Sequence, residues 1–95
     1  MRVIGTIILD KFSRKHAQSK TPLSAWLAEA QANTWQTTQD VKKRYPSASI
    51  LSKNRIVFNI GGNKFRLVVV IRYQNGVVQV LRIGTHAEYD KWKLD

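Results

Sequence analysis

The chain has 95 residues, of which 16 are Lys or Arg and 6 are Asp or Glu, and its formal net charge is +10. This length supports one domain with one modest core, so we take residues 1–95 as a single domain. A domain this basic usually binds a polyanion, and nucleic acid is the first candidate. A membrane surface is the competing candidate, but the basic residues are spread along the chain rather than gathered on one amphipathic helix.

The chain contains no cysteine, which excludes disulfides and thiolate metal sites. Its N-terminal apolar run is short and ends at Asp10, so it fits neither a signal peptide nor a membrane span. The sequence also lacks an HExxH element and any His/Asp/Glu cluster with metal-ligand spacing. We therefore expect a cytoplasmic protein without membrane contacts that uses no metal and no cofactor.

The first half of the chain is predicted to be helical. Residues 2–5 form a short apolar stretch that either begins a helix or forms a brief strand, and residues 6–17 carry apolar side chains at helical spacing. A second helix is expected to begin at Thr21, whose hydroxyl would cap it, with Pro22 in the first helical position. A third, short helix is predicted over residues 38–44, because a Tyr-Pro pair follows.

The second half is predicted to form antiparallel strands at residues 55–60, 65–73 and 77–83, which are rich in β-branched and aromatic side chains. Gly61 and Gly62 would form a two-residue hairpin between the first two strands. Residues 74–76 (Gln-Asn-Gly) suit either a two-residue turn or a three-residue loop with glycine in the left-handed conformation.

The register of the first hairpin decides which face of the sheet carries the charge. A two-residue loop pairs Phe58 with Phe65 and Val57 with Arg66. The face toward the core then holds apolar side chains only: Ile56, Phe58, Ile60, Phe65, Leu67, Val69 and Ile71. The opposite face holds polar side chains: Arg55, Asn59, Lys64, Arg66 and Arg72.

The second loop decides where Arg82 lies. A three-residue loop places Arg82 on the polar face and brings His86 close to the end of that face. A two-residue loop would place Arg82 on the core face, where an unpaired guanidinium is costly. We therefore prefer the longer loop, and we expect one solvent-facing surface of the sheet to be basic.

His86 and Tyr89 are the side chains best suited to proton transfer, because they lie three residues apart on one potential helical face. RNA supplies its own nucleophile, the 2′-hydroxyl, so a ribonuclease needs only a base, cations for the phosphorane charge and an acid for the leaving oxygen. Structural roles explain these residues equally well: His86 as a helix cap, Tyr89 as a packing residue, and Arg66 and Arg82 as solvated charges on an antiparallel sheet.

Two motifs carry a resemblance to a known family. The first is the run NRIVFNIGGNKFRLVV at residues 54–69, and the second is THAEYD at residues 85–90. Both resemble elements of HigB-type toxins, in which V-F-N-I/V-G-G-N precedes a basic strand and T-H-x-E-Y-D lies near the end. Features around Lys20-Thr21, Trp26 and Tyr45-Pro46 are also similar, so the resemblance covers most of the chain.

The resemblance implies a RelE-like α+β fold, with two to three N-terminal helices packed on one face of a small antiparallel sheet and a short C-terminal helix. It also implies the toxin of a type II toxin–antitoxin system, an endoribonuclease (mRNA interferase) that cleaves messenger RNA during translation on the ribosome. The implied partner is a helix-turn-helix antitoxin of the HigA type.

By position, the resemblance gives catalytic roles to Arg66 and Arg82 and the proton-transfer role to His86 or Tyr89, a choice that stays open. The residues expected to contact RNA are Lys64, Asn63, Arg55, Arg72 and Lys53. A rival hypothesis is a non-catalytic RNA-binding module that uses the same basic face. A third is a structural subunit whose positive charge docks an acidic partner. A helix-turn-helix reading frame beside the gene would favour the toxin over both.

Overall fold

The computed structural model describes residues 1–94, which form one five-stranded sheet with helices on both sides. The elements follow in the order β1 (Arg2–Ile4), α1 (Thr6–Lys15), η1 (Ala17–Ser19), α2 (Lys20–Ala32), α3 (Thr38–Arg44), β2 (Ser49–Ile50), β3 (Arg55–Ile60), β4 (Phe65–Arg72), η2 (Tyr73–Asn75), β5 (Val77–Thr85) and α4 (His86–Tyr89). Within the described residues, no helix is long and apolar enough to cross a membrane.

The sheet has the strand order β1-β5-β4-β3-β2. The three long strands β3, β4 and β5 pair antiparallel, as predicted. The sheet is nevertheless mixed, because β1 lies parallel to β5 at one edge and pairs Arg2 with Val77. The two-residue β2 forms the other edge. Neither edge pairing was predicted, since strands this short carry almost no periodic signal.

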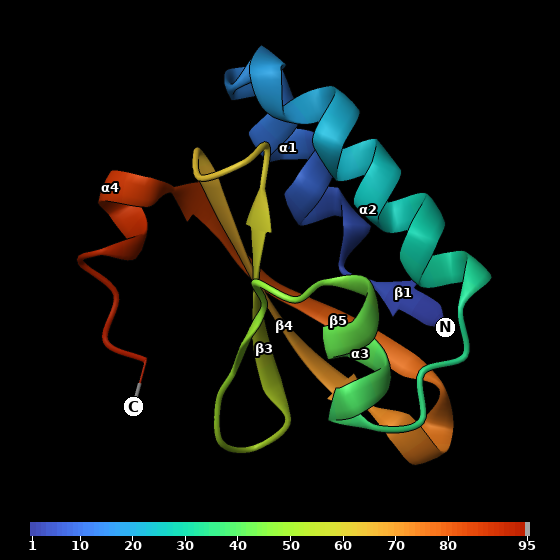
Figure 1. Ribbon diagram of the computed structural model, residues 1–95. Helices are drawn as coiled ribbons and strands as arrows, with labels where there is room; N and C mark the ends of the chain where they lie inside the picture. Colours follow the sequence, from blue (N-terminus) through green and yellow to red (C-terminus); the bar gives the residue numbers. More distant parts are fainter. Residues whose placement is uncertain (95) are drawn as a thin grey trace.

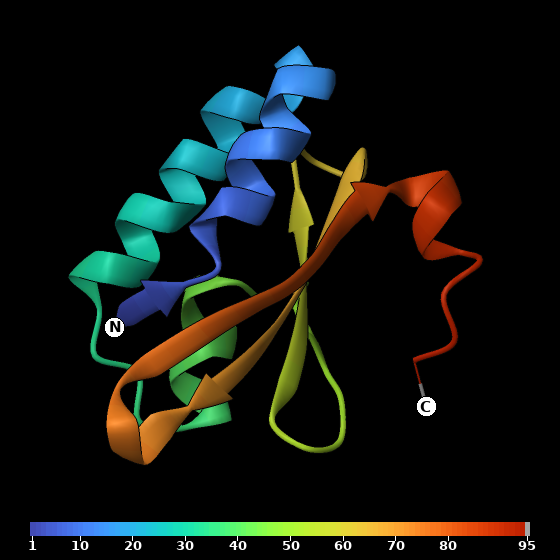
Figure 2. The ribbon, with the colours of Figure 1, turned by 180° about the vertical axis from the view of Figure 1, so that it is seen from behind.

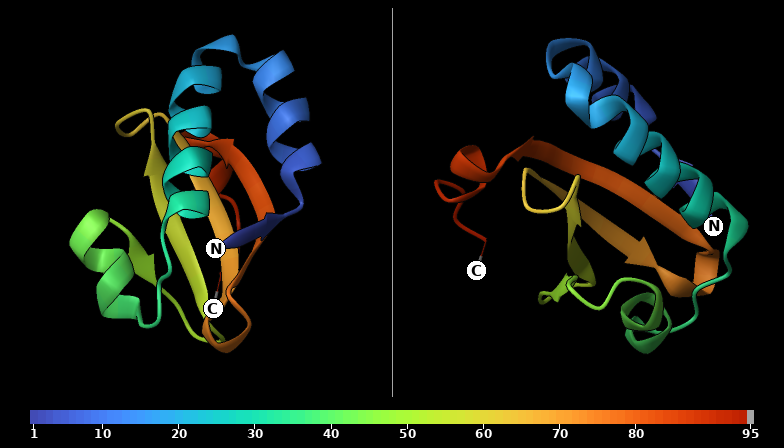
Figure 3. Two further views of the ribbon diagram at one scale, coloured as in Figure 1. Left: turned by 90° about the vertical axis from the view of Figure 1, so that its right-hand side faces the viewer. Right: turned by 45° about the horizontal axis from the view of Figure 1, so that its top comes forward.

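The helices divide between the two faces of the sheet. Helices α1 and α2 lie side by side against one face, whereas α4 and the segment after it lie on the other (Figures 1 and 2). The two further views show α1 and α2 as one layer along β5 (Figure 3). The core lies between this layer and the sheet, where Trp26 contacts Phe58 edge-on at 5.4 Å between ring centroids. Val41 of α3 joins the same core. The predicted α+β class is confirmed.

The predicted start of the second helix was wrong. Helix α2 begins at Lys20, directly after the 3₁₀ turn η1, and no side chain caps it. The hydroxyl of Ser19 instead donates to the carbonyl oxygen of His16 at 2.7 Å. Pro22 still lies in the first helical turn, where the missing N–H group has no partner in any helix.

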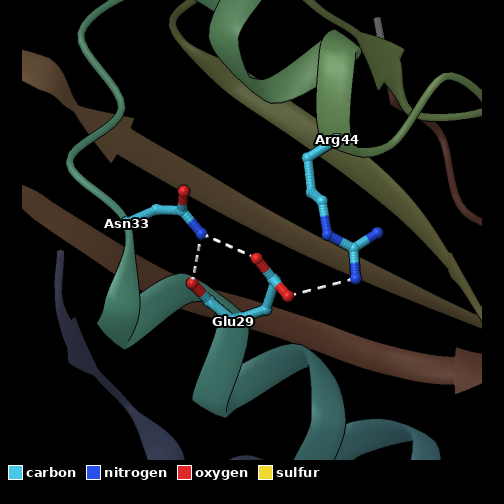
Figure 4. A network of polar contacts seen from close by, with 3 residues as sticks. All are labelled: Glu29, Asn33 and Arg44. Atoms are coloured by element: carbon cyan, nitrogen blue, oxygen red, sulfur yellow. Dashed lines mark hydrogen bonds and ion pairs between the residues drawn. The ribbon is translucent and has the colours of Figure 1, made fainter.

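Helix α3 has the predicted bounds, and its surroundings explain why. Thr37 and Asp40 form a reciprocal capping box at its N-terminus. At its other end, Arg44 donates to Glu29 of α2 at 3.1 Å, and the amide of Asn33 donates to the other oxygen of the same carboxylate at 2.9 Å (Figure 4). These contacts hold the pKa of Glu29 below its ordinary value, the Arg44 hydrogen bond being the largest cause.

The first hairpin has a longer loop than predicted. Its four loop residues are 61–64, and both Gly61 and Gly62 have positive φ angles. The register is therefore Phe58 with Leu67 and Asn59 with Arg66, not Phe58 with Phe65. Because the shift amounts to two residues, each side chain keeps its predicted face. Every residue assigned to the core face is buried.

Arg82 reaches the predicted face by a different route. The loop after β4 comprises residues 73–76, one residue longer than predicted, with Gly76 in the left-handed conformation. That loop alone would turn Arg82 toward the core. A β-bulge corrects the register, because Val69 pairs with Val80 while Val68 pairs with Arg82. The extra residue, Leu81, is exposed.

Candidate active site

Helix α4 is fixed at its first residue. The Thr85 N–H donates to the Glu88 carboxylate at 2.8 Å, and the Glu88 N–H donates to the Thr85 hydroxyl at 3.1 Å. The Thr85 N–H bond is the main reason why the pKa of Glu88 lies below its ordinary value. In addition, the His86 N–H donates to the carbonyl oxygen of Lys64 at 2.9 Å. Helix α4 is therefore docked on the loop between β3 and β4.

The imidazole of His86 is about half exposed and has a carboxylate beside it. Its Nδ1 atom lies 3.3 Å from a carboxylate oxygen of Asp90, one helical turn further on. An acceptor at this position favours the tautomer with its proton on Nδ1, which leaves Nε2 free to accept a proton. Sequence reasoning gave Asp90 no role, although its spacing of four residues from His86 is a signal for such a pair.

Arg66 differs from the prediction. The side chain lies on the expected face of the sheet, but only 9% of the residue is exposed. Its guanidinium donates to the carbonyl oxygens of Asn63 and Phe65 at 3.1 and 3.2 Å, and the ring of Tyr89 lies over it with 5.6 Å to the ring centroid. The face is not open to solvent here, because α4 covers it.

Arg82 is exposed and stacks on an aromatic ring. Its guanidinium carbon lies 4.8 Å from the ring centroid of Trp92. Trp92 in turn contacts Tyr89 edge-on, with 5.8 Å between centroids and 78° between the planes. A continuous row, Arg66–Tyr89–Trp92–Arg82, therefore lies on the outer face of the sheet. Nothing in the sequence indicated that Trp92 lies in this row.

Further positive charge surrounds the start of α4. Lys64 and Asn63 are exposed in the loop under α4, and the Lys64 ammonium lies 3.4 Å from the side-chain oxygen of Gln18. Lys15 and His16, at the end of α1, lie near enough to contribute to the lowered pKa of Glu88. The end of α1 therefore lies within electrostatic range of α4, which nothing in the sequence indicated.

The other predicted RNA contacts lie elsewhere. Arg72 is six residues from Arg66 along β4, roughly 20 Å away, and lines a separate hollow with Gln36 and Gln74. Lys53 is exposed in the turn before β3, at the same distant end. Arg55 lines a small cavity with Arg82 and the end of the described chain, and its guanidinium donates to Ser52. The structure thus brings Arg55 toward Arg82 but leaves Arg72 and Lys53 apart.

The side chains that converge at α4 are an imidazole, a phenol, two guanidiniums and an ammonium group. Among residues 1–94, no three His, Cys, Asp or Glu side chains gather in a way that could hold a metal ion. The carboxylates nearest to the site are already engaged, Asp90 with His86 and Glu88 with Thr85. The arrangement is suited to binding an anion and to moving protons beside it.

The fold and this site define a small basic α+β protein of the RelE-like type. The family model described as HigB_toxin, the RelE-like toxic component of a toxin-antitoxin system, matches residues 19–92. The chain belongs to this family.

Individual relatives extend the match over nearly the full length of the chain. The chain is 29% identical over 93 residues to the mRNA interferase toxin HigB of Escherichia coli strain K12. The matched region covers 95% of this chain and 88% of that protein. The mRNA interferase HigB of Shigella flexneri gives the same values. The mRNA interferase HigB of Escherichia coli O6:H1 is 25% identical over 93 residues, and the match covers 96% of this chain and 90% of that protein.

Proposed function

We propose that this toxin is an endoribonuclease that cleaves messenger RNA at the site built by α4 and the loop between β3 and β4. The observation that carries the proposal is the docking of α4, which places His86 and Tyr89 beside Lys64 and Arg66. The relatives are named mRNA interferases, which agrees with it. The net charge of +10 suits an RNA substrate.

The reaction needs no nucleophile from the protein. The 2′-oxygen of the RNA attacks the neighbouring phosphorus while the bond from phosphorus to the 5′-oxygen of the next nucleotide breaks. A base takes the proton of the 2′-hydroxyl, and an acid gives a proton to the leaving 5′-oxygen. The products are a 2′,3′-cyclic phosphate, or its hydrolysed form, and a free 5′-hydroxyl. Each proton-transfer group is expected to contribute roughly a hundredfold or more to the rate.

His86 is the better placed base, because Asp90 orients its imidazole with Nε2 directed away from the pair. Tyr89 then supplies the proton for the leaving oxygen. Its ring lies over Arg66, so that buried guanidinium adds positive charge beneath the site. Lys64 and Arg82 are the exposed cations that contact the phosphate and balance the charge of the phosphorane.

The proposal includes three further points. The side chains at the site supply base, acid and cations, so cleavage proceeds without a metal ion. The message is cut while it is being translated on the ribosome. The partner that neutralises the toxin is a helix-turn-helix antitoxin of the HigA type; family membership supports the existence of an antitoxin.

The test is to express His86→Ala and Tyr89→Phe separately and to map new transcript ends. Both changes remove a proton-transfer group from a surface helix without opening a core cavity, so we expect loss of cleavage and of growth inhibition, with folding and antitoxin binding retained. Full toxicity in both variants would contradict the assignment. RNA binding without cleavage by the unmodified protein would point to a binding module instead.

The metal-free mechanism has its own test on ribosome-free RNA. Any cleavage that the toxin achieves on this RNA at high concentration should persist in excess EDTA. Loss of cleavage that magnesium alone restores would contradict this part of the proposal. The test is made without ribosomes, because ribosomes themselves need magnesium.

A further inference from the structure

We propose that Trp92 is a positioning residue for RNA cleavage, which holds the Arg82 guanidinium in place while leaving its N–H groups free for the phosphate. The inference rests on the proposed function, because it takes Arg82 as a contact of the phosphate. It adds a role for a residue of the C-terminal segment that does not itself touch the reacting atoms.

The Arg82 guanidinium requires a contact that orients it before the reaction. It projects from β5 as a long, exposed side chain, and such a side chain loses much rotamer freedom when it is fixed. Among residues 1–94, no carboxylate or carbonyl oxygen forms a hydrogen bond or ion pair with its guanidinium. The described contact that orients it is the ring of Trp92, 4.8 Å away. A cation contributes most to a transition state when it is already fixed before the reaction.

The chemistry of the contact matters for function. A carboxylate would fix Arg82 by occupying the same N–H groups that a phosphate needs. The face of an indole ring instead attracts the guanidinium through its π electrons and leaves the N–H groups at the edge of the plane unoccupied. Trp92 therefore orients Arg82 without competing with RNA.

Trp92 has a defined seat on the sheet. Its ring lies directly over Gly84, and a Cβ atom at that position would come within 2.6 Å of Cζ2 and 2.8 Å of Cη2 of the indole. Gly84 is buried, lies opposite Arg66 in the register, and is not among the glycines with positive φ. The absence of a side chain there thus provides space for the indole, and alanine would fit the backbone but displace the ring, while crowding the Glu88 Cβ only slightly at 3.3 Å.

The seat also connects both halves of the row. From above Gly84, the indole contacts Tyr89 on one side and Arg82 on the other. Tyr89 in turn covers Arg66. One ring therefore fixes the distance between the proposed acid and the exposed cation.

The experiment uses five variants of the full chain: Trp92→Ala, Trp92→Phe, Gly84→Ala, Arg82→Ala and the double variant Trp92→Ala/Arg82→Ala. Cleavage of one defined message is followed in a reconstituted translation reaction with toxin in excess, over a series of toxin concentrations. Lys91→Ala serves as the matched control, since Lys91 is an exposed cation of the same segment, next to Trp92 in the sequence.

We expect Trp92→Ala and Gly84→Ala to lower the cleavage rate at saturating toxin by about tenfold, which is a part of the loss expected for Arg82→Ala. The toxin concentration that gives half of the maximal rate should change little. Trp92→Phe should restore most of the rate, and Trp92→Ala should add nothing once Arg82 is absent. In NMR spectra, the Arg82 side-chain protons should be shifted upfield by the indole ring. This shift should be lost in Trp92→Ala and Gly84→Ala and kept in Lys91→Ala.

Two outcomes would overturn the inference while leaving the proposed function intact. The first is a full rate in Trp92→Ala together with a deficient Arg82→Ala. The second is an additive loss in the double variant, which would make Trp92 an independent contact of the RNA. A full rate in Arg82→Ala would instead overturn the phosphate role of Arg82, on which the inference rests, although the proposed cleavage reaction would still be observed. Gly84→Ala keeps the test valid if Trp92→Ala folds poorly.

Discussion

Arg44 and Arg82 each lie 4.8 Å from the centre of a neighbouring aromatic ring, but the rest of their surroundings differ. Arg44 stacks on Tyr45, donates to Glu29 and ties α3 to α2 (Figure 4). The Tyr45 ring packs against Phe58 of the core at 5.1 Å between centroids. Arg82 stacks on Trp92, which lies on the outer face of the sheet.

Stacking of an arginine on an aromatic ring thus has two different roles in this protein. At Arg44, the ring and the carboxylate together satisfy the guanidinium, and the result is a link between two helices. At Arg82, the ring orients the guanidinium but the described residues leave its donors unused. Stacking alone therefore does not identify a functional arginine; an oriented guanidinium without an acceptor is the more informative feature.

The largest expected difference concerns cleavage. Arg82→Ala should lower the single-turnover rate on the order of a hundredfold or more, because a fixed cation near the phosphorane is lost. Arg44→Ala, the matched removal of a stacked arginine, should leave the rate unchanged. Measurement at saturating toxin separates this effect from weaker binding. Equal losses of cleavage rate in Arg82→Ala and Arg44→Ala would contradict the distinction between the two stacked arginines.

For the aromatic partners, the larger loss is expected in stability and at the Arg44 pair, that is, in Tyr45→Ala rather than in Trp92→Ala. Tyr45→Ala removes a partly buried ring from the core and should lower the free energy of unfolding by about 2 kcal/mol. Trp92→Ala removes a ring from the outer face and should cost less, about 1 kcal/mol. Urea unfolding at neutral pH measures both. A larger loss for Trp92→Ala would make the outer row a structural element.

The smallest expected effect is that of the ion pair. Glu29→Gln should lower Tm slightly at neutral pH, because exposed ion pairs contribute little to stability. The pKa of Glu29 is lowered in the folded state, so its contribution is present above its ordinary value of 4.5 and is lost as the pH falls through the folded value. The Tm difference should therefore vanish in acid. A Tm difference that persists well below pH 4.5 would contradict this explanation. The cleavage rate of Glu29→Gln should equal that of the unmodified protein at every pH.

Local signals predicted the parts of the fold that depend on nearby residues. Helix α3 has the predicted bounds because a capping box and a following Tyr-Pro pair define its ends within a few residues. The two faces of β3 and β4 were predicted correctly because a period of two survives an error of two residues in the register. The glycine pair indicated a turn, but it did not specify the four residues that the loop contains.

The sequence named the residues of the candidate site but could not give their arrangement. The motifs named His86, Tyr89, Arg66 and Arg82, and the fold places all four along α4 and the outer face. The burial of Arg66 could not be predicted, since it depends on where the segment after β5 returns to the sheet. The bulge at Leu81 was equally hidden, because one extra residue in a strand leaves no pattern of its own.

The pairing of β1 with β5 has a consequence for synthesis of the toxin. Arg2 pairs with Val77, so β1 finds its partner only after β5 has emerged. Contacts this distant in sequence form late, and α1 packs on the same strand. His86 and Tyr89 follow β5 directly, so the closed sheet and the proposed site form at the same stage of synthesis. A growing chain therefore lacks the proposed site until β5 and α4 have both been translated.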